Sequence, residues 1–60
     1  MQFNVIAFIN ENYPKNAKKD LEIYSNSDDF NYATDYFLKK GYSLPGACKK
    51  ALNQYYYTIF

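Results

Sequence analysis

The fold is decided by residues 43–60, which read SLPGACKKALNQYYYTIF. Ser43 is a good N-cap, and Pro45 is tolerated in a first helical turn, where its missing N–H would lack a partner anyway. Apolar residues then recur at the spacing of one helical face. They are Leu44, Ala47, Cys48, Ala51, Leu52, Tyr55 and Ile59. This pattern predicts a helix whose apolar stripe, including the thiol of Cys48, belongs to the core.

The preceding segment predicts a second helix over about residues 28–40. Ser27 can cap its N-terminus, and the two aspartates that follow favour the positive end of the helix dipole. Its apolar positions Phe30, Ala33, Thr34, Phe37 and Leu38 follow at helical spacing. Gly41 suits the left-handed position after a helix, where Tyr42 can pack back on the last turn. The two helices therefore form an αα-hairpin.

The first half of the chain allows two interpretations. Residues 3–9 are rich in β-branched and aromatic side chains and could form a strand that pairs with residues 20–24. A helix would instead place one broad apolar face inward, end at Pro14, and be followed by a helix carrying Ala17, Leu21 and Tyr24. The face of that first helix comprises Met1, Val5, Ile6, Phe8, Ile9 and Tyr13.

We favour helices because a lone two-stranded hairpin is marginally stable in water. The linker of residues 10–19 also lacks the Asn-Gly or Asp-Gly pair of a tight hairpin. The prediction is an all-α domain of three or four helices spanning residues 1–60, and the alternative is an α+β fold of ββαα order.

Composition restricts the chemistry. The 60 residues include seven basic side chains, all lysine, with no histidine and one cysteine. An intramolecular disulfide is excluded, and neither a structural zinc site nor any other cofactor is expected. The abundance of Lys, Asn, Tyr and Ile is typical of an AT-rich genome.

The N-terminus indicates a cytoplasmic protein. It has no early lysine, and the apolar run of residues 5–9 is too short for a signal sequence or a membrane span. The single cysteine agrees with a reducing compartment. Because the chain begins at Met1, we expect a complete small open reading frame.

Catalysis is not expected. Cys48 has no histidine to activate it. Asp28 and Asp29 are helix neighbours that point in different directions, and capping explains both. The two glycines belong to the turn between the helices rather than to a phosphate-binding loop.

Binding is better supported, because the last helix carries lysines and aromatic rings opposite its apolar stripe. These residues are Lys49, Lys50, Asn53, Tyr56, Tyr57 and Phe60. They could be a solvated face that covers the first helix, a protein interface, or a nucleic-acid surface. From position 39 onward there are four lysines and no acidic residue. Four positive charges are few for a nucleic-acid surface, because contacts to phosphates dominate the affinity of such surfaces.

The turn at Gly41 also fits a DNA-binding helix–turn–helix poorly, because Phe37 stands where a small residue is usual. We therefore predict a protein–protein interaction module that occludes a partner surface. It would be an accessory or inhibitory protein of a bacterium or mobile element, and it could also form a homodimer. Nucleic-acid binding is the alternative.

Overall fold

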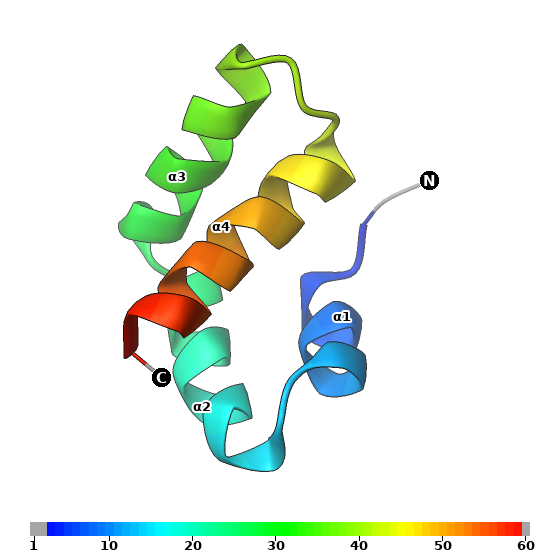
Figure 1. The fold of residues 1–60 in the computed structure, drawn as a ribbon, viewed down its shortest axis with the longest axis vertical. Helices are drawn as coiled ribbons and strands as arrows, with labels where there is room; N and C mark the ends of the chain where they lie inside the picture. The colour runs from blue at the N-terminus through cyan, green and yellow to red at the C-terminus, as the bar shows by residue number, and fades with distance from the viewer. Residues whose placement is uncertain (1–2, 60) are drawn as a thin grey trace.

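The computed structural model describes residues 3–59 and folds them into four α-helices joined by short turns (Figure 1). The helices are α1 (Val5–Asn12), α2 (Lys15–Ser25), α3 (Asp28–Lys39) and α4 (Leu44–Ile59). No strand occurs within this range, so the all-α prediction is confirmed. The alternative with an N-terminal β-hairpin is wrong.

The N-terminal segment is helical because both of its ends are specified locally. The side chain of Asn4 accepts a hydrogen bond of 2.9 Å from the backbone N–H of Ala7 and caps α1. Tyr13 and Pro14 are both extended, since a residue before proline is kept out of the helical region. The chain therefore turns at these two residues and starts α2.

The hairpin of α3 and α4 follows its predicted signals. Ser27 caps α3 by accepting a hydrogen bond of 3.3 Å from the N–H of Phe30. Gly41 has a φ of +103°, and the N–H of Tyr42 donates to the carbonyl of Phe37 at 3.2 Å. The ring of Tyr42 also packs edge-on against Phe37, with centroids 5.5 Å apart. This is a Schellman ending with its usual apolar contact.

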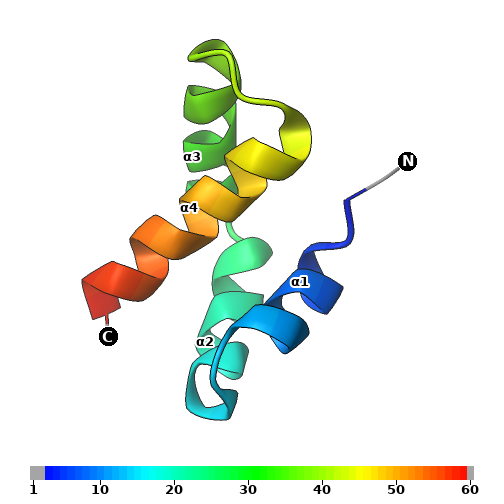
Figure 2. The same cartoon turned by 45° about the vertical axis from the view of Figure 1, so that its right-hand side comes forward.

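Helix α4 organises the molecule. It crosses α2 and α3 diagonally, while these two helices follow one another along the other side (Figures 1 and 2). Helix α1 lies beside α2, on the opposite side of the molecule from α3. The packing of α4 is most extensive against α3.

Every helix contributes to one hydrophobic core. Its buried residues are Ile9, Ala17, Leu21, Phe30, Cys48, Ala51 and Leu52. The predicted stripe of α4 is correct at its centre and wrong at its ends, since Leu44 is 51% exposed and Ile59 is 43% exposed. Both residues lie in terminal turns of α4. On α1, Ile6 is also more exposed than its position on the apolar face predicted.

Candidate partner-binding face

The six residues predicted to bind a partner do not share one environment. Helical spacing places Lys50, Asn53 and Tyr57 in one row of α4, and Lys49, Asn53 and Tyr56 in the adjacent row. The second row faces α1. Asn53 belongs to both rows, and in the first row the ammonium group of Lys50 lies beside the ring of Tyr42 instead. Phe60, the sixth predicted residue, lies outside the described residues.

A row of aromatic rings links α1 to α4. It consists of Phe3, Phe8, Tyr13, Tyr56 and Tyr57, and is called the aromatic row below. Successive ring centroids are 5.6, 5.9, 5.0 and 5.4 Å apart. All four pairs are tilted or edge-on, the arrangements that the ring quadrupole favours. The pair of Tyr13 and Tyr56 carries the connection from one helix to the other.

Two polar residues of α4 reinforce this connection. The ammonium group of Lys49 lies 5.8 Å from the ring centroid of Phe3 and 5.5 Å from that of Phe8, within the range of a cation–π attraction. The hydroxyl of Tyr13 donates a hydrogen bond to Oδ1 of Asn53. Lys49, Asn53 and Tyr56 therefore help to hold α1 in place, as the first of the three interpretations of this face predicted.

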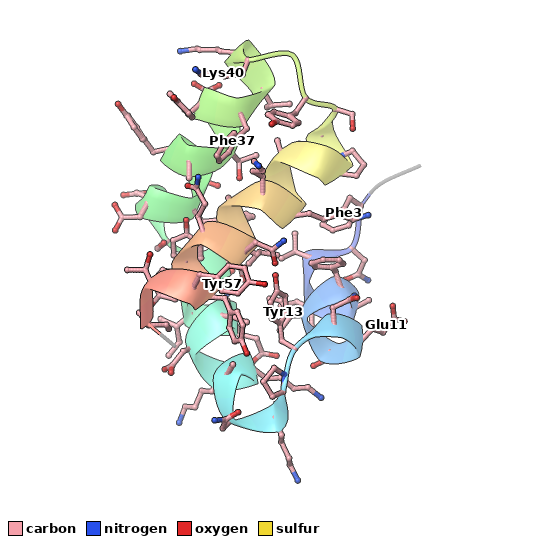
Figure 3. The ribbon with its side chains drawn as sticks, in the orientation of Figure 1. Phe3, Glu11, Tyr13, Phe37, Lys40 and Tyr57 are labelled. Carbon is pink, nitrogen blue, oxygen red and sulfur yellow. The ribbon has the colours of Figure 1, made fainter. Side chains whose placement is uncertain are left out.

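Lys50 and Tyr57 are both exposed, and the ammonium group of Lys50 lies 5.9 Å from the ring centroid of Tyr42. Tyr57 is 77% exposed, and Figure 3 shows it on the same side of the molecule as Tyr13. A shallow depression on α4 is lined by Lys50, Asn53, Gln54, Tyr57 and Thr58, which are called the α4 patch below. The patch offers a cation, two amides, a hydroxyl and an exposed ring within a single helix face.

A second concave surface lies between α1 and the start of α4. It is an open groove lined by Phe3, Asn4, Ala7, Phe8, Glu11, Asn12, Pro45 and Lys49. Two rings of the aromatic row, those of Phe3 and Phe8, contribute its apolar lining. The backbones of α1 and α4 do not pack closely against each other. Long side chains bridge the space between the two helices, and this leaves the groove open.

Sequence reasoning missed the exposed aromatic residues of α3. Tyr32 is 80% exposed and Tyr36 is 50% exposed. Their i, i+4 spacing, away from the stripe of Phe30, Thr34 and Phe37, was the signal that could have found them. Lys40 lies 5.1 Å from the ring centroid of Tyr36, so this second tyrosine already has a neighbour.

Burial makes the thiol of Cys48 unreactive. Burial raises the pKa of this thiol, and a weaker interaction with the Thr34 hydroxyl lowers the same pKa only in part. That hydroxyl is itself buried without a hydrogen-bond partner of normal geometry. A buried thiol with a raised pKa is protonated at neutral pH and is therefore a poor nucleophile.

Burial also raises the pKa of Tyr13, and the nearby Tyr57 and Tyr56 add to the shift. The hydroxyl of Tyr13 thus remains a hydrogen-bond donor to Asn53 well into the alkaline range. Tyr13 is therefore uncharged throughout the neutral range.

Among residues 3–59, no group of three or more His, Cys, Asp or Glu side chains lies close enough to hold a metal ion. None of the described helices has both the length and the apolar character that crossing a bilayer requires. Comparison of the chain with protein-family models, with curated proteins and with solved structures found no match.

Proposed function

We propose that this protein is a binding module that docks on another protein through the α4 patch. The observation that carries the proposal is the exposure of Tyr57, 77%, beside the cation of Lys50 and the amides of Asn53 and Gln54. Tyrosine is enriched among the residues that dominate binding energy, because a rigid ring gives a large contact area at low entropic cost. Tyr57 would be the anchor of the interface.

The proposed partner presents an acidic surface with an apolar recess. From Lys39 to the end of the sequence there are four lysines and no acidic residue, so this segment carries a net positive charge. Lys50 would orient the approaching partner, an effect expressed mainly in the association rate. Docking of a whole helix face would cover the partner surface, which suits an accessory or inhibitory protein of a bacterium or mobile element acting in the cytoplasm.

Two matched tyrosines test this proposal. The chain and its Tyr57→Ala and Tyr32→Ala variants would be immobilised and exposed to a lysate of the source cells, and retained proteins would be quantified by mass spectrometry. We expect a protein that the unmodified chain and Tyr32→Ala retain equally, and that binds Tyr57→Ala roughly thirtyfold more weakly, as for a typical hot spot. Because Tyr32 and Tyr57 are exposed to a similar degree, Tyr32→Ala controls for loss of surface aromatic area.

The result must be repeated with the purified partner and with folded variants. Both substitutions should change the free energy of unfolding by less than about 0.5 kcal/mol, because both rings are mostly in solvent. Retention that does not depend on Tyr57 would refute the proposal. Sedimentation equilibrium of the purified chain at two concentrations shows whether the partner is a second copy.

Single-stranded nucleic acid is the second candidate, since the patch combines a cation, amides and a ring that could stack on a base. We place it second because Lys50 is the only lysine of the patch and the net charge is +1, whereas phosphate contacts dominate such affinities. A mobility shift of a labelled oligonucleotide at low salt, lost in Lys50→Ala and Tyr57→Ala, would reverse this order.

A further inference from the structure

We infer that α1 is a displaceable cover that regulates the partner-binding face of α4. The inference rests on the proposed function. In the structure, α1 engages three of the residues predicted from the sequence to bind a partner, namely Lys49, Asn53 and Tyr56. When α1 moves away, Lys49 and Tyr56 join the α4 patch in one continuous surface, and Tyr13 no longer occupies the side chain of Asn53, which already belongs to the patch.

Helix α1 is the least anchored of the four helices. It has eight residues, and among them only Ile9 is buried. By contrast, α3 buries three residues and α4 buries four. A helix this short is unstable by itself in water, so α1 depends on its contacts with the rest of the molecule. Segments with few buried contacts open locally more often than the core does.

The contacts between α1 and α4 can be broken without disturbing the packing of α3 on α4. Besides the buried side chain of Ile9, which shares the core cluster with residues of α4, they include the aromatic row, the ammonium of Lys49 over two rings, and the hydrogen bond from Tyr13 to Asn53. The last three are side-chain contacts at the edge of the core. The released groups of α4 can be solvated, because a lysine, an amide and a tyrosine hydroxyl are all polar.

The joint between α1 and α2 is suited to such a movement. Tyr13 has φ −126° and ψ 151°, and Pro14 has φ −66° and ψ 155°. Since the proline ring disfavours the helical conformation at Tyr13, α1 and α2 do not merge into one helix. A change in ψ at either residue moves α1 away from α4 and removes the contacts on which its helical conformation depends. Tyr13 belongs to the joint and to the aromatic row, so a movement at the joint breaks the row at its centre.

The closed arrangement dominates because Ile9 is completely buried. A partner that needs the continuous surface therefore binds only the small open fraction, and its measured affinity is reduced by that fraction. Weakening the hold of α1 must then strengthen partner binding. An ordinary structural role of the aromatic row predicts the opposite, that its loss weakens binding.

The test uses Phe8→Ala, which removes the second ring of the row, with Ile6→Ala as its control. Ile6 lies on the same helix, is 40% exposed and does not belong to the row. Amide hydrogen exchange by NMR reports opening of α1 through the N–H of Phe8 and Tyr13, which are bonded to the carbonyls of Asn4 and Ile9. Binding is measured with the purified protein whose retention requires Tyr57.

We expect these amides to exchange faster than those of α3 and α4 in the unmodified chain. Phe8→Ala should raise their exchange roughly tenfold and tighten binding of the Tyr57-dependent protein by a similar factor, because both follow the open fraction. Ile6→Ala should change both by less than about twofold. The double variant Phe8→Ala with Tyr57→Ala should bind weakly again.

Three outcomes overturn the inference, and they are distinct from failure of the proposed function. If α1 exchanges only as slowly as α3 and α4, it does not open separately, whatever the partner does. If Phe8→Ala opens α1 but leaves binding unchanged or weaker, α1 is not a cover and the α4 patch still stands as the site. If no protein depends on Tyr57, the proposed function fails, and the inference fails with it.

Discussion

Gly41 and Gly46 stand on either side of the turn between α3 and α4, but they have opposite conformational requirements. Gly41 has a φ of +103°, with nothing within 4 Å of where a Cβ would lie. Gly46 is in the first turn of α4, where a Cβ would meet the Ser43 side chain at an ordinary 3.4 Å. The penalty for a side chain at Gly41 is therefore purely a backbone effect.

We predict that Gly41→Ala lowers the free energy of unfolding by about 1 to 2 kcal/mol, the cost of a left-handed L-residue. Gly46→Ala should raise it by about 0.5 kcal/mol, because alanine loses less backbone entropy than glycine in a helix. Urea unfolding followed by circular dichroism measures both. Equal effects at the two positions would contradict the role assigned to Gly41.

The thiol of Cys48 gives a second prediction at the residue scale. It lies in the core with 5% exposure, and its pKa is raised by burial. Reaction with a disulfide reagent at neutral pH should be at least about a hundredfold slower in the folded chain than in urea, because exposing a core residue costs several kcal/mol. A folded-state rate near that in urea would show that α3 and α4 do not enclose the thiol.

At the scale of the element, α1 and the α3–α4 hairpin are stabilised in different ways. The hairpin combines two local caps, a Schellman turn and extensive packing. Helix α1 has one cap, one fully buried side chain and a set of ring contacts. Substitutions in α1 should therefore destabilise α1 itself more than they destabilise the α3–α4 hairpin.

Asn4→Ala should destabilise α1 by about 1 kcal/mol, the usual value of an N-cap. Amide exchange at Phe8 should then accelerate roughly fivefold, since 1.4 kcal/mol corresponds to a factor of ten. Asn10→Ala is the control, because Asn10 is an exposed position within the same helix. Equal acceleration in α3 would mean that the four helices open only together.

At the scale of the whole molecule, the titratable groups with shifted pKa values predict an alkaline limit to stability. Burial raises the pKa of Cys48 above its ordinary value of 9.0, and those of Tyr13 and Tyr24 above 10.0. For Tyr24, the charge of Asp29 adds to the effect. Each group retains its proton more strongly when folded, so its contribution is complete below the ordinary pKa and is lost as the pH rises.

We therefore expect the melting temperature to change little between pH 7 and about pH 9 on account of these groups, and to fall beyond that. Cys48→Ala should flatten the decline between about pH 9 and 10, where the thiol alone contributes, and leave the tyrosine region above it. Thermal melts at half-unit pH intervals test both statements. If the melting temperature of Cys48→Ala falls with pH in parallel with that of the unmodified chain, the thiol does not contribute to the alkaline loss of stability.

The sequence by itself determined the features that depend on neighbours within one helical turn. Ser27, Gly41 and Ser43 set the ends of α3 and α4, and the period of apolar residues set the centre of the core. Pro14 marked the joint between the first two helices. These signals act over a few residues, so they can be read before the chain is folded.

Only the tertiary structure decided how the aromatic residues are divided. Tyr24 stacks on Tyr55 at 4.0 Å, and Tyr13 packs against Tyr56 at 5.0 Å. Each pair joins helices that are distant in sequence, and helical spacing cannot show which ring meets which. The predicted face of α4 was therefore divided by α1, which leaves Lys50 and Tyr57 exposed. Local interactions specify helices and their ends, whereas long-range packing chooses which side chains remain available for binding.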